Sequence, residues 1–171
     1  MAFRPTPDAE PIPGYRLLER LGAGGYGEVW KASAPGGLHK AIKFIYGMMD
    51  DSRAGQEIKA LNRIKGVRHP FLLTLERVEV IDAQLVVVTE LADETLISRY
   101  ESFRQQNLAG IPRDILLAYM RDIADALDYM GEKFGLQHLD IKPGNLLLVG
   151  DRVKVADFGL VKDLHGDNVT A

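Results

Sequence analysis

The stretch from Gln137 to Gly159 constrains this chain more than any other, because it gathers several chemically active side chains on two short loops. An apolar run over 146–149 and valines at 153 and 155 predict two short strands. Gly150-Asp151 between them predicts a tight hairpin turn. We therefore expect a β-hairpin with polar loops at its open end.

A hairpin of this length returns the chain to its starting point. Asn145 precedes the first strand and Asp157 follows the second, so we expect the two side chains to lie side by side. Magnesium prefers carboxylate and carbonyl oxygens together with substrate phosphates. Asn145 and Asp157 are therefore predicted metal ligands, and Asp140 and Lys142 are expected to face the same space.

Taken singly, these motifs have simpler interpretations, since a D-x-K pair is usually a solvated ion pair and Asp-Phe-Gly is a turn. Their combined spacing is more specific. It reads His138-x-Asp140-x-Lys142-x-x-Asn145, followed by Asp157-Phe158-Gly159. This pattern resembles the catalytic and metal-binding loops of the eukaryotic-type serine/threonine protein kinase family.

Composition narrows the class of protein. The 171 residues are 46% hydrophobic, enough for one domain or two small lobes. The absence of cysteine excludes disulfides and thiolate metal sites. A net charge of −3 argues against a nucleic-acid partner. With no apolar run near the ~20 residues of a membrane span and no signal peptide, we expect a cytoplasmic protein.

The glycine pattern Gly22-x-Gly24-Gly25-x-Gly27 lies between two predicted strands. A dinucleotide-binding fold uses similar glycines, but there they open a helix. Here the residues 28–31 contain valine and tryptophan and a break follows at Pro35, which favours a second strand. We therefore predict a hairpin flap whose backbone N–H groups approach phosphates. A dinucleotide-dependent oxidoreductase is disfavoured.

Lys43 lies in a predicted strand over 38–45, on the same face as Ala41. It is either a lysine facing water or a phosphate ligand. A helix is predicted over 49–65 from its apolar stripe, with Glu57 at the edge of the stripe. Glu57 is either solvated or paired with Lys43.

Further elements complete the predicted order. Residues 1–13 are proline-rich and predict a flexible leader. Strands are expected over 71–80 and 85–89, with a turn at Asp82-Ala83, and a helix of uncertain limits within 93–109. The clearest helix spans 110–133, with Pro112 in its first turn and Gly135 after its end. We expect a core stripe along it of Leu116, Tyr119, Met120, Ile123, Leu127 and Met130.

The resemblance implies an α+β, bilobal protein-kinase-like fold in a partial kinase domain over 14–171. It comprises a small antiparallel-sheet lobe with one helix over 14–89, a hinge over 90–95 and the first part of a helical large lobe over 96–171. The chain ends soon after Gly159, so the remaining large lobe of the family is missing. That absence predicts an exposed apolar face on the helix over 110–133.

The resemblance also implies ATP and Mg²⁺ as cofactors and a protein Ser/Thr hydroxyl as substrate. Asp140 would be the catalytic base, Lys142 would stabilise the γ-phosphate, and Lys43 paired with Glu57 would hold the other phosphates. His138 is expected to be structural. The implied nucleotide-binding residues are Leu21, Gly22, Gly24, Gly27, Val29, Ala41, Lys43, Glu57, Thr89, Glu90, Ala92 and Leu147.

One departure from the family pattern concerns regulation. Leu139 stands where many kinases carry an arginine that pairs with a phosphorylated loop. We therefore expect activity to depend less on such phosphorylation. Two functions stay open: phosphoryl transfer to proteins, and a non-catalytic nucleotide-binding or scaffolding module that lacks the substrate-binding half.

Overall fold

The computed structural model describes residues 3–24, 27–46, 61–158 and 162–163. The chain divides into two compact units. The sheet unit comprises Met1–Lys65 and Thr74–Leu91, and the helical unit comprises Gly66–Leu73 and Ala92–Ala171. The change of unit at Leu91 falls within the segment predicted as a hinge.

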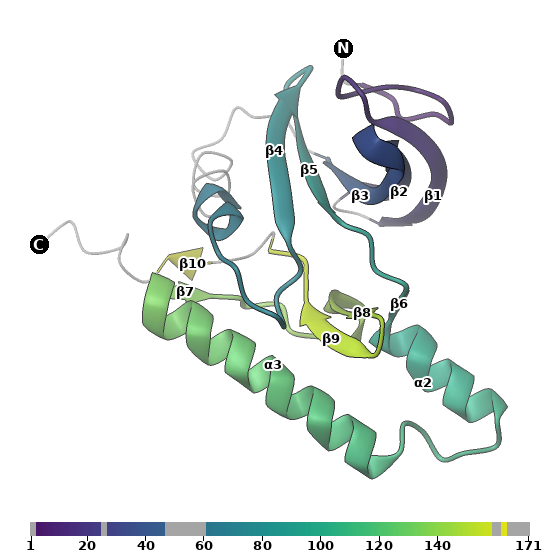
Figure 1. Cartoon of the computed structure of the whole chain (residues 1–171), viewed down its shortest axis with the longest axis vertical. Coiled ribbons are helices and arrows are strands. Elements are labelled where there is room, and N and C mark those ends of the chain that lie inside the picture. Colours follow the sequence, from purple (N-terminus) through teal and green to yellow (C-terminus); the bar gives the residue numbers. More distant parts are fainter. Residues whose placement is uncertain (1–2, 25–26, 47–60, 159–161, 164–171) are drawn as a thin grey trace, which may run out of the picture. The chain divides into compact units, whose positions relative to one another are not determined.

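The sheet unit is built on five antiparallel strands (Figure 1). The strands are β1 (Arg16–Gly24), β2 (Gly27–Ala34), β3 (Leu38–Ile45), β4 (Leu75–Ile81) and β5 (Gln84–Glu90), in the spatial order β1-β2-β3-β5-β4. A 3-10 turn, η1 (Pro35–Gly37), joins β2 to β3. This confirms the predicted antiparallel-sheet lobe and the hairpin on either side of the glycines.

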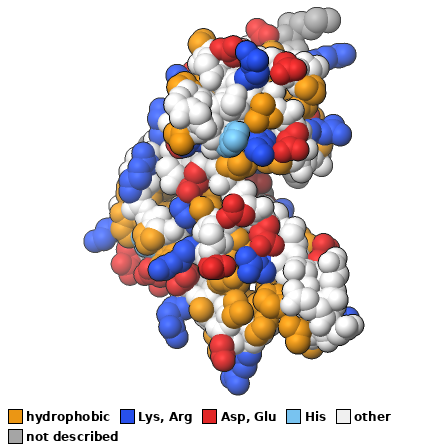
Figure 2. Space-filling view, turned by 45° about the vertical axis from the view of Figure 1, so that its right-hand side comes forward, with side chains coloured by type: hydrophobic (Ala, Val, Ile, Leu, Met, Phe, Trp, Pro, Cys, Tyr) orange, Lys and Arg blue, Asp and Glu red, His pale blue; other side chains and the backbone are white. Residues whose placement is uncertain are grey.

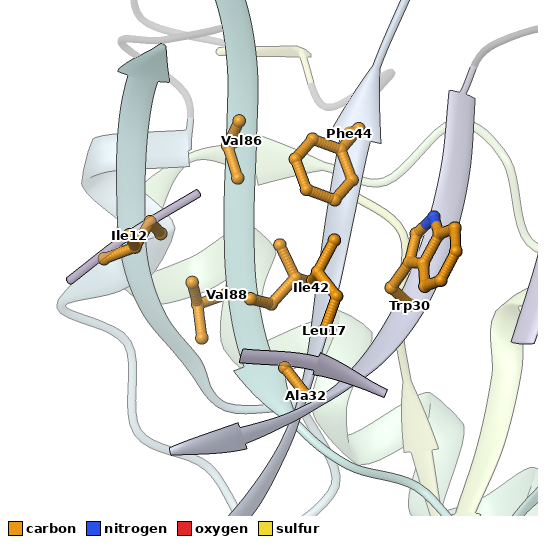
Figure 3. Close-up of a cluster of buried hydrophobic side chains, with 8 residues drawn as sticks. All are labelled: Ile12, Leu17, Trp30, Ala32, Ile42, Phe44, Val86 and Val88. Carbon is orange, nitrogen blue, oxygen red and sulfur yellow. The ribbon is translucent and has the colours of Figure 1, made fainter. Parts of the chain in front are cut away.

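Alternation along the strands gives this sheet two different faces. One face carries a fully apolar cluster formed by Ile12, Leu17, Trp30, Ala32, Ile42, Phe44, Val86 and Val88 (Figure 3). Ala41 and Lys43 alternate with Ile42 and Phe44, so they belong to the opposite face. The sheet therefore separates a hydrophobic core from the face that holds Lys43.

The N-terminal segment, for which the sequence predicted a flexible leader, packs on this core. Phe3 stacks on Phe44 with ring centroids 5.6 Å apart, and Ile12 is only 3% exposed. The backbone N–H of Leu17 also donates to the Ala9 carbonyl at 2.8 Å. The prolines were informative about extended backbone, but the apolar side chains of Phe3 and Ile12 give the segment a surface to bury.

The predicted turn and strand around β4 have different outcomes in the structure. The turn at Asp82-Ala83 is confirmed, with φ of 49° and 61°, the two-residue turn that suits antiparallel strands. The strand expected over 71–80 is wrong at its start, because β4 begins at Leu75. Phe71 and Leu73 instead make backbone hydrogen bonds to Val155, within the helical unit.

Only the end of the predicted helix over 49–65 can be compared. Residues 61–65 are helical, and Leu61 and Ile64 are buried. Glu57 and the rest of its apolar stripe lie outside the described residues. Their predicted contacts therefore stay predictions.

The described part of the helical unit contains two α-helices and three short strand pairs (Figure 1). Its elements are β6 (Glu94–Thr95), α2 (Leu96–Gln105), α3 (Arg113–Phe134), β7 (Leu136–Gln137), η2 (Pro143–Asn145), β8 (Leu146–Val149), β9 (Arg152–Val155) and β10 (Lys162–Asp163). Strand β8 pairs with both β6 and β9, and β7 pairs with β10. The Thr95 hydroxyl caps α2 by accepting from the Ser98 N–H at 3.0 Å.

Helix α3 begins and ends close to the predicted positions. Pro112 is its N-cap, and Gly135 ends it in the left-handed conformation at φ 62°. The core stripe is partly wrong: Tyr119, Ile123 and Met130 are buried, whereas Leu116 is 37% exposed and Met120 is 41% exposed.

The burial of α3 follows its neighbours within the unit. The helix contacts β7 and β9, which bury Ala126 and Met130 along its C-terminal half. Ile115 and Leu117 in its first turns are exposed. On the molecular face drawn in Figure 2, hydrophobic side chains, in orange, reach the surface among charged ones. No helix among the described residues is long and apolar enough to span a membrane.

Among the described glycines of the flap, Gly27 occupies a position that no other residue type fits. Its φ is 149°, and a Cβ atom there would overlap the carbonyl oxygen of Phe44 on the paired strand. We predict that Gly27→Ala lowers the free energy of unfolding by about 2–4 kcal/mol in a denaturant titration. Gly22→Ala is the matched control, because a Cβ at Gly22 meets no atom within 4 Å. Equal stability of the two variants would contradict this account.

Candidate functional site

The β8–β9 hairpin brings two ends of the polar stretch together. Leu146 pairs with Val155, and the Ala156 N–H donates to the Asn145 carbonyl at 2.9 Å. Gly150 makes the turn with φ 60°. The backbone of Asn145 therefore lies beside that of Ala156, one residue from Asp157.

A hydrogen-bonded cluster forms around the carboxylate of Asp140. Its Oδ2 accepts from Lys142 Nζ at 2.7 Å and from Asn145 Nδ2 at 2.8 Å. Asn145 Nδ2 also donates to the backbone carbonyl of Asp140 at 2.9 Å. Asn145 is only 6% exposed, so its amide is fixed by these bonds. With its nitrogen committed to Asp140, its Oδ1 remains for another ligand.

The electrostatics of the cluster keep Asp140 ionised. The hydrogen bond from Lys142 is the main cause that lowers the pKa of Asp140 below its ordinary value, and the bond from Asn145 adds to it. The Asp140 side chain is 29% exposed. The carboxylate is therefore both charged near neutral pH and open to a reactant. The ion pair that the D-x-K motif suggests on its own is present in the structure.

His138 has a supporting position behind this cluster. Its ring is 3% exposed and packs edge-on against Phe158, with centroids 5.7 Å apart. Nδ1 accepts from the Asp140 N–H at 3.3 Å, so Nε2 carries the hydrogen that it donates to the Ala156 carbonyl at 2.8 Å. The neutral imidazole therefore links the Asp140 loop to the end of β9.

Two residues of the cluster hold a backbone conformation that the sequence did not reveal. Leu139 and Asp157 both have φ 61°, in the left-handed region that non-glycine residues rarely enter. Leucine in particular gives no signal for this region. Such strain is maintained by surrounding bonds and concentrates at functional sites. Leu139 is also 60% exposed, so its side chain contributes little to the core.

The donor set can accommodate a magnesium ion. The Oδ1 atom of Asn145 and the carboxylate of Asp157 are both hard oxygen ligands, and the hairpin brings their backbones together. No group of three or more His, Cys, Asp or Glu gathers within the part of the chain that the structure describes. A metal held here by these two residues would need further oxygens, and phosphate groups supply them.

The sheet unit gathers its own set of predicted residues on one face. Lys43 pairs across the strands with Val29 on one side and Val87 on the other, and Ala41 pairs with Thr89. Direct cross-strand partners share a face, so Val29, Ala41, Lys43 and Thr89 lie together. Gly22 and Gly24 belong to the adjoining β1–β2 hairpin, where Leu21 is 49% exposed.

The backbone and side chain of Glu90, in the segment predicted as a hinge, are hydrogen-bonded to Thr74. The Glu90 N–H donates to the Thr74 carbonyl at 3.0 Å, and the Glu90 carboxylate accepts from the Thr74 N–H at 2.6 Å. The Glu90 carbonyl accepts a further bond from the Thr89 hydroxyl at 3.0 Å. In the helical unit, Ala92 and Leu147 are both half-buried.

One structural residue was missed from the sequence. The carboxylate of Asp93 accepts from the Gly150 N–H at 2.6 Å, and the Asp93 N–H donates to the Leu148 carbonyl at 2.8 Å. These bonds tie the β8–β9 hairpin to the residue that precedes β6. The sequence separation of the partners leaves no local pattern to find.

The burial of His138 predicts a pH dependence of stability. Burial lowers the pKa of His138, and the bond to Ala156 only partly opposes this. The unfolded chain, with an ordinary imidazole pKa of about 6.5, therefore binds a proton before the folded chain does. Stability should fall as pH drops through about 6.5. We expect the melting temperature of His138→Gln to change less between pH 7.5 and 5.5 than that of the parent.

His39→Gln is the control for this measurement, because His39 is exposed on the sheet unit. Its melting temperature should follow the parent over the same pH range. If His138→Gln kept the full pH dependence, the neutral buried imidazole would be the wrong assignment.

Comparison with known proteins agrees with this arrangement. The protein kinase domain family model matches residues 15–171. A probable serine/threonine-protein kinase of Dictyostelium discoideum is 30% identical over 88% of this chain and 29% of its own length. CBL-interacting protein kinase 4 of Oryza sativa subsp. japonica is 35% identical over 88% of this chain and 34% of its own length.

The similarity extends beyond the serine/threonine kinases. Tyrosine-protein kinase Srms of Mus musculus is 30% identical over 92% of this chain and 31% of its own length. The chain thus spans about a third of the length of these curated relatives. With the family model matching nearly all of the sequence, the chain belongs to the protein kinase family.

Proposed function

We propose that this chain is the nucleotide-binding and catalytic-loop portion of an ATP-dependent protein serine/threonine kinase. The observation that carries the proposal is the ionised Asp140 carboxylate, held by Lys142 and Asn145 and still 29% exposed. A scaffold has no chemical need for a charged, oriented and accessible carboxylate in this position. Phosphoryl transfer needs such a group to orient a hydroxyl nucleophile.

In this proposal Asp140 accepts the proton of the substrate hydroxyl as its oxygen attacks the γ-phosphorus of ATP. The bond from that phosphorus to the β–γ bridging oxygen breaks, and ADP is the leaving group. The bonds to Lys142 and Asn145 fix the direction of its carboxylate before the reaction. Lys142, whose side chain is 56% exposed, neutralises charge on the transferring phosphoryl group. Since phosphoryl transfer depends mostly on positioning and charge neutralisation, these roles are sufficient for a catalytic loop.

The remaining roles are divided between the two units. In the sheet unit, the glycine hairpin and Lys43 bind phosphates, and Val29 and Ala41 contact the adenine ring. In the helical unit, Asn145 and Asp157 would hold magnesium, which neutralises phosphate charge when bound. The Glu90 carbonyl and the Ala92 backbone would bind the adenine edge. Glu57 is proposed as the partner of Lys43 on the family resemblance.

The preference for serine and threonine rests on two supports. Lys142-Pro143 is similar to the loop of the serine/threonine branch. The relative from Dictyostelium discoideum is a serine/threonine kinase by name. The similarity to a tyrosine kinase is the reason why this preference is part of the proposal.

Magnesium-ATP should stabilise the folded chain. A ligand that binds only the folded state adds RT ln(1 + [L]/Kd) to the stability, about 2.7 kcal/mol at 100 times Kd. We expect the melting temperature to rise with ATP only when magnesium is present, and the rise to be lost in Asp157→Asn. A rise with NAD and none with ATP would contradict the proposal and revive the dinucleotide-binding alternative.

Asp140→Asn should separate catalysis from binding. Loss of a general base costs about 10²–10⁴ in rate, so phosphorylation of a serine-containing peptide should fall by that factor while ATP-dependent stabilisation is kept. Asp151→Asn is the matched control, because the Asp151 side chain is 96% exposed in the hairpin turn. Full activity of Asp140→Asn would show that the base is wrongly assigned. Binding of ATP without any transfer by the parent chain would favour the scaffold alternative.

A further inference from the structure

A cavity lies in the sheet unit on the face opposite Lys43. Its volume is about 480 Å³, a size that suits small ligands. Glu28 and Gln84 line it from the ends of β2 and β5, and Phe3 lines it from the N-terminal segment. Glu28 alternates with Val29, whose cross-strand partner is Lys43. The cavity is therefore separate from the proposed phosphate-binding face.

The first unusual group in this cavity is the carboxylate of Glu28. It is only 8% exposed, and its Oε2 accepts from the indole Nε1 of Trp30 at 3.0 Å. Across the described ranges, no lysine, arginine or histidine lies within ion-pair distance of it. A buried carboxylate is costly unless a positive charge and further donors accompany it.

The second unusual group is the side-chain amide of Gln84, which is 5% exposed. Its Oε1 is the one buried side-chain oxygen or nitrogen without a hydrogen-bond partner in the part of the chain that the structure describes. A buried acceptor without a donor costs about 1–3 kcal/mol. The same cavity is thus lined by two buried acceptor groups. Glu28 is hydrogen-bonded to Trp30 and Tyr46 but has no positive partner among the described residues, and Gln84 Oε1 has no donor.

The rim of the cavity has the opposite character. Arg4 and Arg20 both line it and both are exposed, and neither forms an ion pair with a carboxylate of the described residues. Tyr46 lies between the two regions: desolvation raises its pKa first, and the neighbouring Glu28 carboxylate raises it further. Arg20 acts on the Tyr46 pKa in the opposite direction, so its guanidinium is also near.

We propose that this cavity binds a small zwitterion of the amino-acid class. Its ammonium or guanidinium group would donate to Glu28 and Gln84, and its carboxylate would face Arg4 and Arg20. The aromatic ring of Phe3, stacked on Phe44, gives the cation a further favourable surface. The site would respond to a metabolite independently of ATP, because it uses the opposite face of the sheet.

Three probes test the charge pattern by isothermal titration calorimetry. L-arginine carries both the cation and the carboxylate, agmatine lacks the carboxylate, and glutarate lacks the cation. We expect L-arginine to bind at least tenfold more tightly than either of the others. Absence of L-arginine binding, or equal affinity for agmatine, would overturn the proposal.

Two variants test the residues. Glu28→Gln removes the charge and should weaken L-arginine binding at least tenfold. Gln84→Met removes the acceptor at similar volume and should weaken binding too, while the melting temperature of the free protein stays equal or rises, because a buried group without a partner is removed. A merely structural Gln84 would instead lose stability on this change.

Gln105→Met is the matched control, because Gln105 is exposed at the end of α2 in the helical unit. Its L-arginine affinity should equal that of the parent. A lower melting temperature for Gln84→Met with unchanged L-arginine affinity would show that the amide is part of the fold and that the cavity has no ligand of this class.

Discussion

The antiparallel pairing of β8 with β9 is the constraint on which the polar site of the helical unit depends. Four cross-strand pairs, closed by a turn at Gly150, return the chain to Asn145. The bond from the Ala156 N–H to the Asn145 carbonyl then fixes Asp157 as the next residue. A change of register by one residue would move Asn145 and Asp157 to different faces of the hairpin. Strand pairing therefore sets the proximity of Asn145 and Asp157.

Beside this hairpin, hydrogen bonds made by His138 and Asn145 hold the loop that carries Asp140. His138 spans from the Asp140 N–H to the Ala156 carbonyl, and Asn145 spans from the Asp140 carboxylate to the start of β8. The unfavourable backbone of Leu139 and Asp157 is held within this network. A preorganised carboxylate of this kind suits a reaction in which the protein contributes position and charge. In the sheet unit, strand geometry also positions the polar side chains. Strand β3 places Lys43 and Ala41 on one face and its core residues on the other.

The parts of the fold that could be predicted were those with local signals. Gly150-Asp151 and Asp82-Ala83 marked turns, and Gly135 marked the end of α3, because each needs a backbone conformation that few residues tolerate. The packing of Phe3 and Ile12 was not foreseen, since proline content suggests extended chain but does not show whether that chain finds a surface. The exposure of Met120 and Leu116 was not foreseen for a similar reason. Helical periodicity identifies the apolar face of a helix, but it does not show how much of that face a neighbouring element covers.

The site was predictable in its residue types and less so in its contacts. The spacing from His138 to Asp157 was informative because the hairpin converts sequence distance into proximity. The left-handed backbone of Leu139 had no such signal, because leucine rarely adopts a positive φ. The bond from Gly150 to Asp93 had none either, because it joins segments that are distant in the sequence.

The central claim is that Asn145 and Asp157 hold a divalent metal with nucleotide phosphates. Paramagnetic broadening of backbone amide signals by Mn²⁺ with ADP tests it directly in a ¹H–¹⁵N NMR spectrum. The account predicts selective broadening at residues 140, 145 and 157, and its loss in Asp157→Asn. Broadening centred elsewhere, such as the Asp82-Ala83 turn, or unchanged broadening in Asp157→Asn would contradict it.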